Sequence, residues 1–149
     1  MMEITRENFI INKETIPALL LVEDDEIDTE SFMRALKKSR IPNALYCASD
    51  GVEAMDYLHG ENGKQKLVQP CVIFLDINMP RMNGFELLEV IRANGDLKNN
   101  IVFMLTTSAR TKDIELAYNF NVAGYIVKSN LLDMTELLQK YLGCNEFPN

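Results

Sequence analysis

Carboxylate side chains come directly after two short apolar runs of this sequence, where they could bind a metal or accept a phosphoryl group. Glu23, Asp24 and Asp25 follow the first run, and Asp76 ends a later one. Like charges a few ångströms apart are unfavourable unless a cation compensates them. Sites with few oxygen ligands from the protein suit Mg²⁺, which keeps several waters. If the two runs lie side by side, the sequence predicts a divalent cation beside Asp76.

A hydroxyl and an ammonium group follow two further apolar runs and complete the set that phosphoryl transfer needs. Thr106 comes after residues 101–105, and Lys128 comes after residues 125–127. Transfer to an oxygen nucleophile requires in-line attack, a metal on one phosphoryl oxygen and donors on the others. Each residue alone is typical of a turn, a helix cap or an exposed lysine. Together they favour a reaction centre with Asp76 as nucleophile.

The apolar runs have the length of strands and alternate with segments of helical periodicity. Runs that are apolar without alternation are covered on both faces, which with intervening helices is typical of a three-layer domain with a parallel sheet. We therefore predict an α/β fold: a doubly wound, flavodoxin-like, five-stranded parallel sheet of order 2-1-3-4-5. In such a sheet, ligands bind beyond the carboxyl ends of strands 1 and 3. The predicted strands are residues 18–22, 44–48, 71–75, 101–105 and 125–127, and the predicted helices are residues 27–38, 52–58, 85–92, 114–120 and 131–142.

Length and composition indicate one globular domain. The 149 residues match the length of a single domain, so we expect no separate output domain. We place an N-terminal extension at residues 1–16, the domain at 17–143 and a C-terminal tail at 144–149. The net charge of −7 would repel a phosphate backbone, which argues against direct nucleic-acid binding.

The cysteines and the apolar runs indicate a cytoplasmic protein without a membrane segment. The three cysteines are an odd number and contain no Cys-x-x-Cys pair, which is typical of a reducing compartment. The apolar run at residues 18–22 is too short for a signal peptide or a membrane span.

Four motifs, in order, resemble the receiver domain of two-component response regulators. They are Leu21-Val22-Glu23-Asp24-Asp25, Ile73 to Pro80 followed by Asn83-Gly84, Leu105-Thr106, and Gly124-Tyr125-Ile126-Val127-Lys128. The resemblance covers residues 17–143. It implies a phosphorelay switch that accepts a phosphoryl group from the phosphohistidine of a histidine kinase and signals by changing its surface. Such a domain catalyses only its own phosphotransfer and dephosphorylation and is not otherwise an enzyme.

The resemblance also implies which residues form the metal site. Asp76 would be the phospho-acceptor and a ligand of Mg²⁺ or Mn²⁺. Asp24 would bind the cation directly, and Glu23 would bind it through water. The backbone carbonyl of Asn78 would complete the ligands that the protein supplies.

Three further residues would form the switch. Thr106 resembles the hydroxyl that turns toward the phosphoryl group, and Lys128 resembles its counter-charge. Tyr125 resembles the aromatic side chain that swings inward when Thr106 moves. Asp25 and Asp28 have no fixed role in the pattern, and Asp28 is expected only to complement the dipole of the helix that starts near it.

Two positions depart from the family pattern. Ser129 stands where receivers usually have a proline after the lysine, often with a cis bond, and a cis bond before serine would cost about 2.5–4 kcal/mol. We therefore predict a trans Lys128–Ser129 bond. Ser108 stands where longer polar groups often position the hydrolytic water, which bears on the lifetime of the phosphoryl group. Three features together resemble the single-domain receivers that work with phytochrome-type and related sensor kinases: the long loop at residues 60–70, the Val22-Glu23-Asp24 run followed by Asp28, and Leu105-Thr106-Thr107-Ser108.

A sensor histidine kinase is the partner that the resemblance implies. The surface expected to change on phosphorylation is formed by residues 112–142, and it could also support a homodimer. Its candidate contact residues are Tyr118, Phe120 and Tyr141.

Two other classes of protein compete with this interpretation. A phosphatase or phosphotransferase with an aspartate nucleophile commonly has a second aspartate two residues later as general acid, but Asn78 stands there. A flavodoxin-like binding module would need a glycine- or hydroxyl-rich loop after the first strand to bind the phosphate of a flavin. This chain has acids there, which would repel the phosphate.

Overall fold

Five short strands pair in parallel in the order β2-β1-β3-β4-β5, as predicted. The computed structural model describes residues 16–79, 82–107, 110–131, 136 and 138. Each strand lies within one residue of its predicted bounds at either end. The strands are β1 (Leu19–Val22), β2 (Leu45–Ala48), β3 (Val72–Asp76), β4 (Ile101–Thr106) and β5 (Gly124–Val127).

Three of the four helices given below begin after residues whose side chains satisfy free backbone donors. Asp25 accepts from the backbone N–H of Asp28, and Asn83 forms a capping box with Glu86. Most of the helix predicted over residues 131–142 lies outside the described residues. The described helices are α2 (Glu26–Lys38), α3 (Gly51–His59), α4 (Gly84–Ala93) and α5 (Thr111–Asn119).

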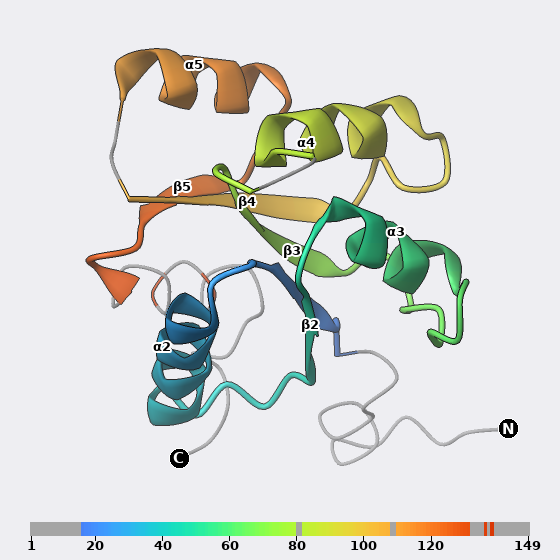
Figure 1. Ribbon diagram of the computed structural model, residues 1–149, viewed down its shortest axis with the longest axis horizontal. Coiled ribbons are helices and arrows are strands. Elements are labelled where there is room, and N and C mark those ends of the chain that lie inside the picture. The colour runs from blue at the N-terminus through green and yellow to red at the C-terminus, as the bar shows by residue number, and fades with distance from the viewer. Residues whose placement is uncertain (1–15, 80–81, 108–109, 132–135, 137, 139–149) are drawn as a thin grey trace, which may run out of the picture.

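The sheet is buried on both faces, which explains why its strands are apolar without alternation. On one face, Leu20 and Val22 of β1 pack in the apolar cluster that includes residues of α3, α4 and α5. On the other face, Leu19 and Leu21 pack with Phe32 of α2. Figure 1 shows the resulting layers, with α4 and α5 on one side of the sheet and α2 on the other. The three-layer architecture is therefore confirmed.

Parallel pairing brings the carboxyl ends of the central strands to one edge of the sheet. Val22 pairs with Leu75, so Glu23 and Asp76 follow at the same level. Beyond β5, the backbone N–H of Lys128 donates to the carbonyl oxygen of Thr106 at 2.7 Å. The Lys128–Ser129 bond is trans, as predicted, since within the described chain the cis bond recorded is Gln69–Pro70.

Arg92 lies in the last turn of α4 and connects this helix to two loops by hydrogen bonds. Its guanidinium donates to the carbonyl oxygens of Lys98, Asn100, Phe120 and Asn121 at 2.7–3.2 Å. These carbonyls flank the beginning of β4 and the connection between α5 and β5. The planar guanidinium group of arginine can donate to all four carbonyl oxygens, whereas the ammonium group of a lysine cannot.

We predict that Arg92→Ala lowers the free energy of unfolding by about 2–3 kcal/mol, because four carbonyl oxygens lose a charged donor. Arg92→Lys should show most of this loss. Arg34 is exposed on α2, and Arg34→Ala is expected to stay within about 0.5 kcal/mol. Urea unfolding of the three variants checks the prediction, and equal stabilities for Arg92→Ala and Arg34→Ala would refute it.

The described cysteines are free, and Cys71 is fully buried in the core. Burial raises the pKa of the Cys71 thiol to about 12, as expected for a cysteine that serves as a small apolar residue. In the part of the chain that the structure describes, every helix is too short or too polar to cross a bilayer.

Candidate functional site

Three carboxylates meet at the edge of the sheet where β1 and β3 end. Glu23, Asp24 and Asp76 each offer an oxygen, and these oxygens all lie within 4.8 Å of one another. Glu23 and Asp76 are buried, while Asp24 faces solvent. The predicted convergence of the acids is therefore found, and the set of oxygens fits a divalent cation with one open side for water.

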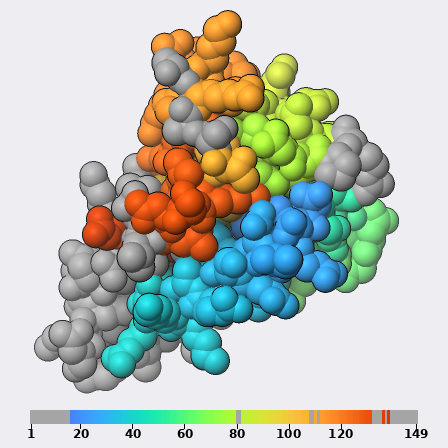
Figure 2. All heavy atoms as spheres, turned by 60° about the vertical axis from the view of Figure 1, so that its left-hand side comes forward, coloured from blue at the N-terminus to red at the C-terminus, as the bar shows by residue number. Residues whose placement is uncertain are grey.

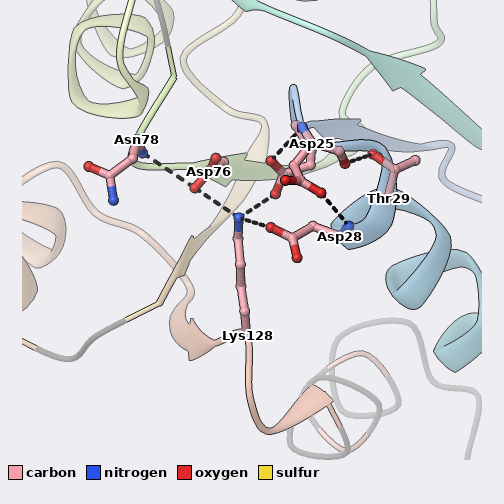
Figure 3. Close-up of polar contacts among 7 residues, drawn as sticks. Asp25, Asp28, Thr29, Asp76, Asn78 and Lys128 are labelled. Atoms are coloured by element: carbon pink, nitrogen blue, oxygen red, sulfur yellow. Dashed lines mark hydrogen bonds and ion pairs between the residues drawn. The ribbon is translucent and has the colours of Figure 1, made fainter.

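Lys128 extends from the end of β5 into this cluster, and Figure 3 shows its ammonium group among the carboxylates. Its Nζ lies 2.5 Å from Oε1 of Glu23, 2.9 Å from Oδ2 of Asp28 and 3.2 Å from Oδ1 of Asp76. Burial alone would lower the pKa of Lys128, but hydrogen bonds to Glu23 and Asp28 outweigh it and raise the pKa. Lys128 therefore stays charged beside Asp76.

The Glu23 carboxylate is buried close to a second negative charge, that of Asp76. Its side chain is 1% exposed, and burial raises its pKa to about 7. The negative charge of Asp76 adds to this rise. Hydrogen bonds from Lys128 and from the backbone N–H of Asp25 oppose it. One ammonium group thus compensates the charge of Glu23 incompletely, and a divalent cation would supply further positive charge.

The residues that follow Asp76 contact both its side chain and its backbone. The backbone N–H of Asn78 donates to Oδ1 of Asp76 at 3.3 Å, and the Asn78 side chain points away from the cluster (Figure 3). Gly84, the first residue of α4, packs so tightly that a Cβ there would lie 2.4 Å from the Asp76 carbonyl oxygen. Its N–H donates to the carbonyl oxygen of Ile77 at 3.0 Å. The start of α4 therefore fixes the position of the Asp76 backbone at the edge of the sheet.

A family model of the response regulator receiver domain matches residues 19–141. The chain belongs to this family. It is thus a response regulator of the two-component type, in which a receiver domain takes part in a phosphorelay.

Relatives with known names support the assignment. The response regulator Rcp1 of Synechocystis is 37% identical over 122 residues, which are 81% of this chain and 83% of Rcp1. The Mn²⁺-bound form of Rcp1 superposes with a TM-score of 0.73 at 33% identity, covering 85% of this receiver and 94% of Rcp1. The phosphorylated cyanobacterial phytochrome response regulator RcpA gives a TM-score of 0.74 at 31% identity, covering 87% and 95% of the two chains.

The two residues predicted to form the switch also lie together. Thr106, which is 2% exposed, shares a side-chain hydrogen bond with Tyr125. Burial raises the pKa of Tyr125, and this hydrogen bond opposes the rise. The Tyr125 ring is half-buried and packs against the apolar cluster on the α4 and α5 side of the sheet. The structure thus joins the end of β4 to β5 through these two side chains.

The expected signalling surface is described in part. Tyr118 is 49% exposed on α5, as expected, but Phe120 packs against the core. Phe120 follows the last residue of α5 and is partly buried against the core, so Tyr118 is the more accessible of the two described candidates. Tyr141 and Ser108 lie outside the described residues.

Asp28 is a site residue that sequence reasoning missed. It was expected to complement the helix dipole, and it does lie in the first turn of α2. Its carboxylate also accepts from Nζ of Lys128 at 2.9 Å, across a separation of 100 residues. No local spacing could reveal that contact, because it depends on how α2 sits against the end of β5.

Proposed function

We propose that Asp76 accepts a phosphoryl group from the phosphohistidine of a sensor histidine kinase. The observation that carries this proposal is the placement of Asp76 Oδ1 3.2 Å from Nζ of Lys128, within the cluster of Glu23 and Asp24. A carboxylate beside a fixed ammonium group and a metal-binding set can attack phosphorus while its surroundings neutralise the charge that builds up on the phosphoryl oxygens.

Each neighbouring residue has a part in this proposal. Lys128 provides the counter-charge to the phosphoryl group, and Thr106 provides a hydroxyl donor. Asp24, Asp76 and the backbone carbonyl of Asn78 would bind the cation, and Glu23 would bind it through water. Bound Mg²⁺ or Mn²⁺ would supply positive charge to the phosphoryl oxygens and to the crowded acids. The Mn²⁺-bound form of the relative Rcp1 supports the choice of a divalent metal.

We expect Mg²⁺ to stabilise this protein by about 2.7 kcal/mol at a concentration 100-fold above its Kd, because binding to the folded state alone shifts unfolding. Asp24→Asn should lose most of this gain, since it removes a direct ligand. Glu26→Gln makes the same change of charge two residues away and should keep it. Thermal melting with Mg²⁺ and with a chelator measures the effect, and an unchanged gain in Asp24→Asn would contradict the ligand assignment.

The signal is proposed to leave through Thr106 and Tyr125. When Thr106 turns toward the phosphoryl group, it breaks its contact with Tyr125, and the ring repacks against α5 and β5. Tyr118 and Leu116 are exposed on α5 and could contact a partner or a second copy of this chain. The phytochrome response regulators among its relatives favour a phytochrome-type kinase as the phosphoryl donor. Such a relay would operate in the cytoplasm and without nucleic acid.

A phosphatase function is the rival that the site itself argues against. Asn78 occupies the position of a general acid, and an amide cannot donate a proton to a leaving group in that way. Its side chain also points away from Asp76 (Figure 3). The chemistry therefore serves a switch that catalyses only its own phosphotransfer and dephosphorylation.

Incubation with acetyl phosphate and Mg²⁺ followed by intact-mass measurement tests the proposal. The expected result is a mass gain of one phosphoryl group that disappears when a chelator replaces Mg²⁺. A mass that stays unchanged with the metal present, together with no phosphate released from acetyl phosphate, would rule the function out. Steady phosphate release without a lasting mass gain would still indicate a phosphorylated intermediate of short lifetime.

A further inference from the structure

The Asp28 carboxylate reaches Lys128 from outside the metal-binding set. It lies on the first turn of α2, and its side chain is 37% exposed, whereas that of Lys128 is 13% exposed. Figure 2 shows the blue residues of α2 in contact with the orange-red residues around the end of β5. Asp28 therefore lies at the outer surface of the site and contacts the ammonium group on its solvent side.

Three carboxylates surround the ammonium group of Lys128, and the one on Asp28 accepts a hydrogen bond from it at 2.9 Å. An ammonium group has three N–H donors, and its neighbours are Glu23, Asp28 and Asp76. Two of these acceptors, Glu23 and Asp76, belong to the cluster whose oxygens could hold a cation. Asp28 lies outside that set, so a cation bound there would leave the hydrogen bond between Asp28 and Lys128 in place.

The carboxylate of Asp28 is anchored by the helix that carries it. The backbone N–H of Asp28 donates to Oδ1 of Asp25 at 3.0 Å, which fixes the first turn of α2. A cavity of about 60 Å³ lies beside the ion pair, and its lining combines polar and apolar side chains: Glu23, Asp28, Ser31 and Lys128 with Leu21, Phe32, Leu105 and Leu131. A lysine has a flexible four-carbon stem, so without Asp28 its ammonium group would have space to turn away from Asp76.

We propose that Asp28 is a positioning residue for phosphoryl transfer to Asp76, an inference that rests on the proposed function. By holding one N–H of Lys128, Asp28 keeps a second N–H directed at Asp76, where the phosphoryl oxygens arrive. Asp28 touches neither the cation nor the phosphoryl group. Its effect is exerted through the orientation of Lys128.

Two substitutions at Asp28 distinguish the effect of its acceptor oxygen from the effect of its charge. Asp28→Asn keeps an oxygen in the same place and removes the charge, while Asp28→Ala removes both. Glu26→Ala is the matched control, because Glu26 is an exposed acid of the same helix turn. The measurement is the rate of phosphorylation by acetyl phosphate at saturating Mg²⁺, with the Mg²⁺ affinity taken from the thermal shift.

We expect Asp28→Ala to be phosphorylated about tenfold more slowly than Asp28→Asn, because a misplaced donor lowers the rate while metal binding is untouched. The two variants should bind Mg²⁺ equally, melt normally and lose their difference in rate in a Lys128→Ala background. Glu26→Ala should match the wild type.

Failure of this inference differs from failure of the proposed function. If the wild type is not phosphorylated at all, the proposed function is wrong. If the wild type is phosphorylated and Asp28→Ala matches Asp28→Asn, Asp28 does not position Lys128. A rate difference that persists in the Lys128→Ala background would equally overturn the proposal.

Discussion

Asp76→Asn abolishes the mass gain with acetyl phosphate and Mg²⁺, which is the largest effect we expect from a single change. An amide oxygen is a far weaker nucleophile than a carboxylate, so the covalent step fails although the side chain keeps its shape. The fold should persist, because the substitution removes one of three crowded carboxylates while preserving volume. Intact-mass measurement over time gives the result directly.

Asp96→Asn provides the matched control, since Asp96 is an exposed aspartate that does not belong to the carboxylate cluster. It should be phosphorylated like the wild type. Peptide mapping of the phosphorylated wild type should place the group on Asp76. A mass gain that survives in Asp76→Asn, or a label on Thr106, would show that a different nucleophile acts.

Gly84→Ala is expected to disturb both the fold and the reaction. Its Cβ would lie 2.4 Å from the carbonyl oxygen of Asp76 and 3.0 Å from Cα of Ile77, so backbone must move. Forcing atoms into such a contact typically destabilises by about 1–3 kcal/mol, which exceeds the gain of about 1 kcal/mol in helix propensity. A shift of Asp76 by about 1 Å would slow phosphorylation about 100-fold.

Gly95→Ala is the control for Gly84, because a Cβ at Gly95 would meet no heavy atom within 4 Å. Its φ is not positive, so alanine should be neutral or stabilise slightly by about 0.4–1 kcal/mol. Urea unfolding and acetyl phosphate kinetics measure both variants. Wild-type rates in Gly84→Ala would show that α4 does not set the position of Asp76.

The sheet was predictable because burial leaves a direct mark on composition. A strand covered on both faces is apolar at every position, as in β1 and β3, and the runs stand out from their polar flanks. Helices with a capping side chain were also located closely. The start of α5 was placed three residues late, since its N-cap residue Arg110 makes no side-chain cap hydrogen bond.

The candidate site divides into predictable and unpredictable parts for a physical reason. Asp76 and the acids after β1 are attached to strand ends, and the order of strands alone brings them together. The contact of Asp28 with Lys128 depends instead on the tilt and depth of α2. The hydrogen bonds of Arg92 likewise depend on the conformation of two loops, which carry the carbonyl groups of Lys98, Asn100, Phe120 and Asn121. Neither is encoded in a local pattern.

The separation of 100 residues between Asp28 and Lys128 has a consequence during synthesis. A ribosome that adds about 5–20 residues per second needs about 5–20 s to pass from one to the other. During that interval Glu23, Asp24 and Asp28 have no ammonium partner, Asp76 is added about halfway through it, and β5 has not yet paired with β4. We therefore expect the growing chain to be a poor phosphoryl acceptor until its last strand has been added, so that a new molecule starts unphosphorylated.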